Sequence, residues 1–137
     1  MPSFGKKSNK NLKTCDWDLQ QIFNEVVKYY DCTILEGHRG EEQQNLNFKN
    51  KVSKVKWPDG KHNSYPSKAV DASPYPIPPN WGENHWKDMV HFYRLAAIVK
   101  FVAESKGVKI RWGGDWNGDN NFKDNKFEDL VHYEIID

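Results

Sequence analysis

Residues 60–76 read GKHNSYPSKAVDASPYP, and this stretch decides how the rest of the chain is interpreted. Its apolar pair Ala69–Val70 stands directly before Asp71, so residues 69–71 are predicted to form a short core strand. The prolines after Asp71 are predicted to end that strand, because each removes a backbone donor from the sheet. His62 precedes Asp71 by nine positions, so a loop histidine and a strand carboxylate lie close along the chain.

The segments on either side supply helices and further strands. Residues 16–30 and 84–106 carry apolar side chains at helical spacing, and Gly107 is predicted to stop the longer helix. A further helix is expected to open near residue 40, and residues 48–66 are polar and typical of a long loop or a weak hairpin. The remaining predicted strands are residues 32–36, 108–112 and 130–136. This order predicts an α+β domain with a small, mostly antiparallel sheet packed with helices.

The composition narrows the class of protein. The 137 residues fit one domain. The chain has 20 Lys and Arg against 19 Asp and Glu, so its net charge is too small to attract nucleic acid or a membrane surface. No apolar run approaches the roughly 20 residues that span a bilayer, and the N-terminus lacks the apolar core of a signal peptide. We therefore expect a soluble, monomeric protein, made in the cytoplasm, that recognises its partner locally.

A third candidate ligand, His132, lies in the last predicted strand. A catalytic zinc site takes three protein ligands from His, Asp or Glu and leaves a fourth position for water, and His62, Asp71 and His132 could form such a set. Each residue also has an ordinary explanation, since a loop histidine usually faces solvent and an aspartate can cap a turn. Spacing alone leaves both explanations open.

Four separated segments resemble one family of zinc peptidases, which includes D-Ala-D-Ala carboxypeptidases and dipeptidases and the L-alanyl-D-glutamate peptidases of phage endolysins. Two resemble its metal-binding segments, HNSYPSKAVD at 62–71 and EDLVHYE at 128–134. GHRGEEQQ at 37–44 resembles the family's Gly-x-Arg segment with its later Gln, and WGGDW at 112–116 resembles a stretch of the endolysin branch. The resemblance implies a fold of the hedgehog and D-Ala-D-Ala peptidase type, in one zinc peptidase domain over residues 1–137.

The same resemblance implies that His62, Asp71 and His132 hold zinc, which activates the water that attacks an amide carbonyl. The sequence departs from the family pattern at two points. The family's aspartate follows its histidine by seven positions, whereas the interval from His62 to Asp71 is nine, and Gly60 stands where the family has Ser. We expect a tight turn at residues 64–66 to absorb the two extra residues.

Asp129 matches the family's general base, which takes a proton from water and delivers it to the leaving amine. Glu134 is the alternative, because positions 132 and 134 share one face of a strand and 129 does not unless the chain bends. Arg39 matches the family's arginine, whose guanidinium would hold an oxyanion or a substrate carboxylate. Gln43, or Gln44 beside it, is expected to support Arg39 in binding substrate.

Two other groups of residues have functional interpretations. Trp112 and Trp116 are candidates for the walls of a peptide groove, unless one of them belongs to the core. Residues 115–124 alternate Asp and Asn as calcium loops do, although the bidentate Glu of an EF-hand is missing. The candidate calcium ligands are Asp115, Asn117, Asp119, Asn121 and Asp124. A hydrated turn is the alternative for this loop.

The resemblance therefore implies a zinc-dependent peptidoglycan hydrolase, a phage endolysin that cuts the L-alanyl-D-glutamate amide of bacterial stem peptides. It would collect in the host cytoplasm and degrade the cell wall once the membrane is breached, with an antimicrobial effect. Two alternatives stay open, a D-Ala-D-Ala carboxypeptidase or dipeptidase and a catalytically inert wall-binding module of the same fold. Asp129 and Arg39 argue against the inert module, because binding alone needs neither a base nor an oxyanion partner.

Overall fold

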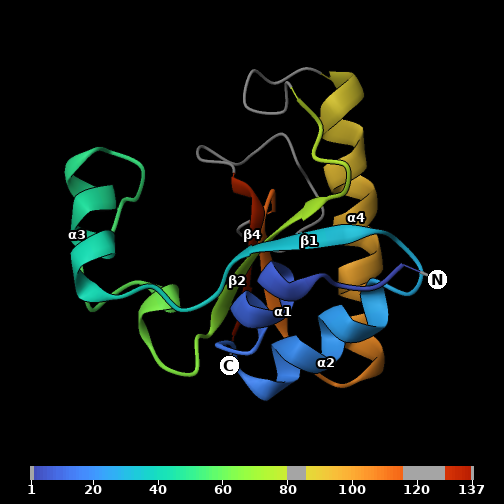
Figure 1. Ribbon diagram of the computed structural model, residues 1–137, viewed down its shortest axis with the longest axis horizontal. Coiled ribbons are helices and arrows are strands. Elements are labelled where there is room, and N and C mark those ends of the chain that lie inside the picture. Colours follow the sequence, from blue (N-terminus) through green and yellow to red (C-terminus); the bar gives the residue numbers. More distant parts are fainter. Residues whose placement is uncertain (1, 80–85, 116–128, 137) are drawn as a thin grey trace.

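The computed structural model describes residues 2–79, 86–115 and 129–136 (Figure 1). Within these ranges the elements are, in chain order, α1 (Lys6–Leu12), α2 (Trp17–Val26), β1 (Cys32–Glu36), α3 (Glu41–Lys49), the 3-10 turn η1 (Lys61–Asn63), β2 (Ala69–Pro74), α4 (Trp86–Ser105), β3 (Ile110–Gly113) and β4 (Asp129–Ile135). Helices and strands alternate from β1 to β3, but neighbouring strands of the sheet run antiparallel, which agrees with the predicted α+β class.

The strands form one sheet in the order β1-β2-β4-β3. Each neighbouring pair is antiparallel, so the predicted sheet is confirmed. In the central pair, Asp71 of β2 stands directly opposite His132 of β4. Directly opposed residues of an antiparallel pair have Cβ atoms about 4.5–5.5 Å apart, so the register itself brings these two candidate ligands together.

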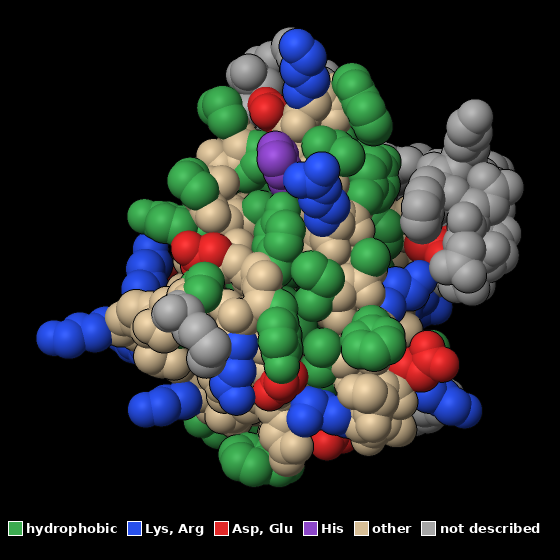
Figure 2. Space-filling view, turned by 90° about the vertical axis from the view of Figure 1, so that its right-hand side faces the viewer, with side chains coloured by type: hydrophobic (Ala, Val, Ile, Leu, Met, Phe, Trp, Pro, Cys, Tyr) green, Lys and Arg blue, Asp and Glu red, His purple; other side chains and the backbone are tan. Residues whose placement is uncertain are grey.

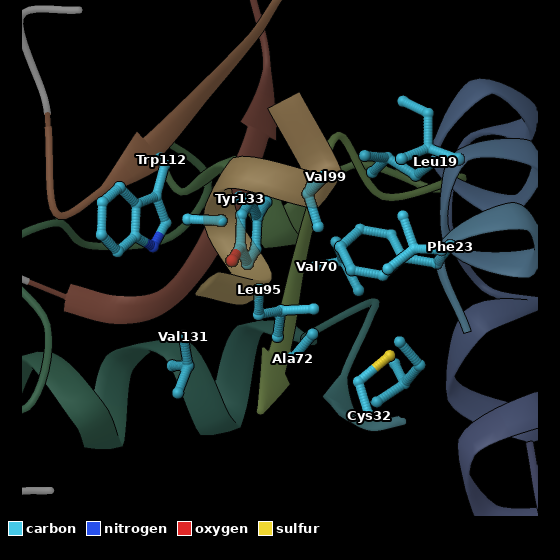
Figure 3. Close-up of a cluster of buried hydrophobic side chains, with 14 of the residues drawn as sticks. Leu19, Phe23, Cys32, Val70, Ala72, Leu95, Val99, Trp112, Val131 and Tyr133 are labelled. Atoms are coloured by element: carbon cyan, nitrogen blue, oxygen red, sulfur yellow. The ribbon is translucent and has the colours of Figure 1, made fainter. Parts of the chain in front are cut away.

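The core lies between this sheet and the two longer helices. α4 packs against β2, β3 and β4, and α2 packs against α4. Figure 3 shows side chains of both layers in contact, including Phe23 of α2, Leu95 of α4 and Tyr133 of β4, all fully buried. The rings of Phe23 and Tyr133 meet edge to face with centroids 5.5 Å apart. Burying a side chain such as Leu95 contributes about 2 kcal/mol, so the helices hold the strands firmly.

Alternation along the central strands separates the core from a polar face. Val70 and Tyr133 are fully buried in the apolar cluster of Figure 3. Successive side chains of a strand point to opposite faces, so Asp71 and His132, each next to one of these residues, point away from the core. The packing of α4 on one face therefore directs the candidate ligands to the other.

The outer side of the helical layer is partly apolar. Figure 2 shows apolar side chains gathered along the middle of this face. A cavity of about 460 Å³ lies between α2 and α4, where Tyr29, Ile98 and Phe101 line it. None of the candidate ligands lines this cavity. Among the described residues, no helix combines the length and the apolar character needed to cross a membrane.

Several element bounds differ from the predictions, and one helix was missed. β2 does not end at Asp71 but continues to Pro74, which pairs with Cys32 at the end of the ladder. Proline is tolerated there because only the last position loses its donor, while the preceding residues keep theirs. α2 ends at Val26, and the chain then turns before residue 30. α1 was not predicted.

α1 could not be predicted from the sequence, because hydrogen bonds to β1 rather than an apolar pattern stabilise it. Only Ser8 and Leu12 of its seven residues are buried, so it shows almost no apolar periodicity. The Ser8 hydroxyl hydrogen-bonds Thr33 Oγ1 at 2.9 Å and accepts from the backbone N–H of Ile34 at 3.0 Å. Both partners belong to β1, which a pattern within residues 6–12 cannot reveal.

A close backbone approach fixes where β4 begins. The pairing of β3 with β4 shifts register between Trp112 and Gly113, and Gly113 faces Asp129. A Cβ atom on Gly113 would overlap the carbonyl oxygen of Asp129. Only glycine lets the two strands approach this closely, and the register shift sets the position of Asp129 relative to His132.

We predict that Gly113→Ala destabilises the protein by about 2 kcal/mol, because the added methyl must push two paired backbones apart. Thermal unfolding followed by circular dichroism measures the effect. Gly5→Ala is the matched control, since a Cβ there meets nothing within 4 Å. Equal melting temperatures for the two variants would contradict the account of this strand pair.

Candidate metal centre

The three predicted ligands converge at one point of the polar face. His62 comes from η1, Asp71 from β2 and His132 from the facing position of β4. Asp71 Oδ1 lies 3.2 Å from His62 Nε2 and 3.3 Å from His132 Nδ1. One ligand atom of each residue lies within 4.8 Å of the others, which makes a candidate His/Asp/His metal site. Tetrahedral ligands bonded at about 2.0–2.1 Å lie about 3.3 Å apart, so the two short separations fit one ion.

His62 and Asp71 lie close together in space although nine positions separate them in the sequence. The chain that leads into β2 is anchored to the loop before α2, because Ser67 N donates to Thr14 O and Asp16 N donates to Ser67 O, both at 2.8 Å. The backbone N–H of Arg39 donates to His62 O, also at 2.8 Å. Residues 64–66 therefore connect two anchored points, and both ligands stay within reach of each other.

The outer nitrogen of each histidine is hydrogen-bonded so that the inner one can bind a metal. His62 Nδ1 lies 2.7 Å from the carbonyl oxygen of Gly37, which only accepts, so Nδ1 donates and Nε2 carries the lone pair in the neutral ring. His132 Nε2 lies 2.8 Å from Glu134 Oε1, and the same reasoning leaves Nδ1 for a metal. Protein ligands of metals are oriented in this way, so the residues present fit a divalent ion.

The charges at the centre favour a cation. Burial would raise the pKa of Asp71, but hydrogen bonds from His132 and His62 outweigh it and hold that pKa well below its usual range. Burial would lower the pKa of His132, but its contacts with Asp71 and Glu134 raise it to about 9. The surroundings of His132 therefore stabilise positive charge, and a metal ion would take the place of its proton.

Arg39 lies beside this centre and is fixed from two sides. Its guanidinium donates to Glu36 through Nε and Nη2 and to Gln44 Oε1 through Nη1 at 2.9 Å. Nη2 lies 3.9 Å from Asp71 Oδ2. Of the two glutamines considered from the sequence, Gln44 is the one that contacts Arg39, whereas Gln43 is exposed and donates to Asn47 Oδ1. The support expected from Gln43 therefore comes from Gln44, because that side of α3 faces the body of the protein.

Gln44 joins three parts of the structure. It is fully buried, and its Oε1 also accepts from Asn63 Nδ2 at 3.0 Å. Its Nε2 donates to Ser53 Oγ at 3.0 Å and to Val55 O at 2.7 Å. Asn63 follows His62 directly, so one amide links α3, the loop after it and the turn that carries a candidate ligand.

Asp129 and Glu134 have different surroundings. Burial and the charge of Asp71 raise the pKa of the Asp129 carboxyl, which also interacts electrostatically with His132 and His62. Burial would raise the pKa of Glu134 too, but hydrogen bonds from His132 and Arg111 lower it to about 2. Glu134 Oε2 accepts from Arg111 Nη2 at 2.8 Å, so both of its oxygens are engaged.

The prediction that Trp112 walls a substrate groove is wrong. Its side chain is 1 % exposed, its Nε1 donates to Leu130 O at 2.9 Å, and Tyr93 packs against its ring. The strand that carries Trp112 faces α4 at this position, so the indole belongs to the core. Trp116, the other predicted wall, lies outside the described residues.

Only the first residue of the predicted calcium loop is described. Asp115 is buried, and its Oδ2 lies 3.6 Å from Lys100 Nζ of α4. The other candidate ligands, Asn117, Asp119, Asn121 and Asp124, lie outside the described residues. Calcium binding by this loop stays a prediction.

Two contributors to the site were missed in the sequence. Glu36, which holds Arg39, pairs with Asp71 across β1 and β2, at an irregularity of the ladder that no local pattern reveals. Arg111 was also missed, although it could have been found. It alternates with core residues on β3 and stands opposite Glu134 on β4, so opposite charges in two neighbouring predicted strands were the available signal.

Comparisons with known proteins identify relatives of this chain. A family model described as phage L-alanyl-D-glutamate peptidase matches residues 2–136. The L-alanyl-D-glutamate peptidase of Escherichia phage T5 is 31% identical over 123 residues, which cover 88% of this chain and 86% of that protein. The crystal structure of the Serratia marcescens L-Ala D-Glu endopeptidase ChiX superposes with a TM-score of 0.72 at 20% identity, over 98% of this chain and 91% of the other. The structural match establishes a shared fold.

We predict that Glu134→Gln weakens binding of a divalent metal about tenfold, because His132 loses the charged partner that orients its ring. Competition with a chromophoric chelator measures the affinity. Glu104→Gln is the control, since Glu104 is an exposed acid of α4. If both variants bind metal as tightly as the parent protein, Glu134 does not support the ligand.

Proposed function

Because the chain belongs to the family of phage L-alanyl-D-glutamate peptidases, we propose that it hydrolyses the amide between L-alanine and D-glutamate in bacterial peptidoglycan, with zinc as its metal. The chain is a peptidase of this family. The observation that carries the proposal is the convergence of His62, Asp71 and His132, whose ligand atoms lie together near the partly buried Asp129 carboxyl group. Binding alone would not require that carboxyl, which argues against an inert wall-binding module.

Zinc suits the donor set better than calcium or magnesium. Two imidazole nitrogens and one carboxylate are ligands that zinc accepts, whereas calcium and magnesium prefer oxygen alone. When bound, zinc polarises a carbonyl and lowers the pKa of water from about 15.7 to near 7. His62, Asp71 and His132 are the residues that would hold it. Gly37 and Glu134 would keep the two imidazoles oriented.

Asp129 is the proposed general base. Its pKa is raised by burial and by Asp71, which brings the carboxyl closer to the range in which it can take and return a proton near neutral pH. Glu134 is less suited, because its two oxygens already accept from His132 and Arg111 and its pKa is lowered to about 2. We therefore assign proton transfer to Asp129 and orientation of His132 to Glu134.

Arg39 is the proposed partner of the substrate. Glu36 and Gln44 fix the plane of its guanidinium, and the side chain is only 12% exposed. Donors that these two residues leave unused could hold the oxygen of the scissile carbonyl or a substrate carboxylate. Because the guanidinium is held in advance, little side-chain entropy would be lost when substrate binds.

The cellular setting follows from the family. A phage enzyme of this kind would collect in the host cytoplasm and reach the stem peptides of the wall after the membrane is breached. We propose a monomer with this single domain as its catalytic unit. A D-Ala-D-Ala carboxypeptidase or dipeptidase is the second candidate, because the resemblance of its metal-binding segments covers both activities.

Digestion of purified peptidoglycan, read by mass spectrometry, tests the function. We expect products that end at L-alanine and begin at D-glutamate, and we expect a chelator to abolish them. Release of D-alanine alone would favour the second candidate. Full activity after removal of the metal would overturn the metal-dependent mechanism.

Two substitutions separate metal binding from proton transfer in the same assay. Asp129→Asn should retain the metal and lose turnover by a factor of about 10²–10⁴, the usual contribution of a general base. His132→Ala should lose metal and activity together. If Asp129→Asn stays fully active, the assignment of the base is wrong.

We further predict that Gln44→Ala raises KM more than it lowers kcat, because Arg39 loses a partner that positions it while the metal ligands keep theirs. Steady-state kinetics on a soluble stem peptide and metal affinity provide the two readouts. Gln43→Ala is the matched control, one position away on the exposed side of α3. The positioning role is refuted if both variants have the parent KM, or if Gln44→Ala acts only by losing the metal.

A further inference from the structure

The segment that contains α3 stands apart from the rest of the fold. Figure 1 shows α3 well separated from the sheet, and Gln44 is the one buried residue among residues 41–59, which we call the α3 lobe. Its exposed apolar side chains are Leu46, Phe48, Val52 and Val55. A nine-residue helix is marginal in water when it packs no apolar face against a core. The lobe is held instead by the hydrogen bonds of Gln44.

Positive charge is concentrated in the middle of the lobe, while its three acids, Glu41, Glu42 and Asp59, lie at its two ends. From residue 43 to residue 58 the chain has no Asp or Glu, and Lys49, Lys51, Lys54 and Lys56 are all exposed. The whole chain carries a formal charge of only +1, so this stretch is far more positive than the average surface. Lys56 Nζ lies 5.0 Å from the centroid of the Phe48 ring, so cations and apolar surface are presented side by side.

The position of the lobe connects it to the candidate active site. Gln44 is the residue that binds Arg39 Nη1 and Asn63 Nδ2, and Asn63 is adjacent to the ligand His62. α3 begins at Glu41, and only Gly40 separates it from Arg39 in the sequence. Anything that binds to the lobe is therefore held next to the metal centre.

We propose that the α3 lobe binds the carboxylate-bearing peptides of the peptidoglycan that surround the stem peptide being cut. This inference rests on the proposed function and names a second contact with the same substrate. Stem peptides alternate carboxylates with alanine methyl groups, and the lobe alternates lysines with apolar side chains such as Val52 and Val55. Each exposed ion pair is weak, but several on one polymer act together.

The experiment compares two sets of four charges. In one variant Lys49, Lys51, Lys54 and Lys56 are changed to Gln. In the control, the exposed lysines of the α1 region, Lys6, Lys7, Lys10 and Lys13, are changed to Gln, so the net charge falls equally. Co-sedimentation with purified peptidoglycan sacculi is measured in the Asp129→Asn background at low salt, and turnover of a soluble stem-peptide monomer is measured in the parent background.

We expect the lobe variant to bind sacculi about tenfold more weakly than the control and to lose the salt dependence of binding. Its turnover of the soluble monomer should stay within about twofold of the parent protein, since Arg39 and the ligands are untouched. Equal binding by both variants would overturn the inference. So would binding of the parent to anionic phospholipid vesicles but not to sacculi, with loss of that binding in the lobe variant.

Failure of this inference is distinguishable from failure of the proposed function. If the parent protein does not cut the soluble monomer, the proposed function fails whatever the sedimentation assay gives. If the parent cuts the monomer and the lobe variant sediments like the control, only the role of the lobe is wrong. Matching unfolding temperatures of the two variants establish that both are folded.

Discussion

A largely buried carboxylate shared by two histidines is the constraint on which this structure depends. Asp71 stands opposite His132 across β2 and β4, and His62 reaches the same oxygen from η1. A carboxylate with so little access to water is costly unless it is paired, and the pairs lower its pKa. The sheet register, the turn at η1 and the outer hydrogen bonds of both imidazoles all serve to keep these three groups together.

The remainder of the site is built around that centre in layers. Glu134 and Gly37 hold the outer nitrogens of the histidines, and Arg111 holds Glu134. On the other side, Gln44 fixes Arg39 and ties the lysine-bearing α3 lobe to the turn that carries His62. Core packing by α2 and α4 lies on the opposite face of the sheet. The core and the candidate catalytic residues therefore lie on opposite faces of the same strands. Substitutions on the outer helices should leave the catalytic residues in place.

The metal ligands could be predicted from the sequence, whereas most of the residues around them could not. Asp71 and His132 were predictable because alternation of apolar and polar residues in two strands directs them to one face, and the resemblance paired them with His62. Gln44 could not be preferred over Gln43, because the choice depends on which side of α3 meets Arg39. Trp112 was misassigned because an aromatic residue beside glycines suits either a groove or a core. α1 depends on the hydrogen bonds of Ser8 to β1, which no local pattern contains.

The most direct test of the central claim is the position of the metal. Anomalous scattering at the zinc absorption edge, from crystals of the zinc-loaded protein, would locate it. The account predicts one dominant peak within bonding distance of His62 Nε2, a carboxylate oxygen of Asp71 and His132 Nδ1. A zinc peak elsewhere in an active enzyme, or an ion that leaves one of these three side chains uncoordinated, would contradict it.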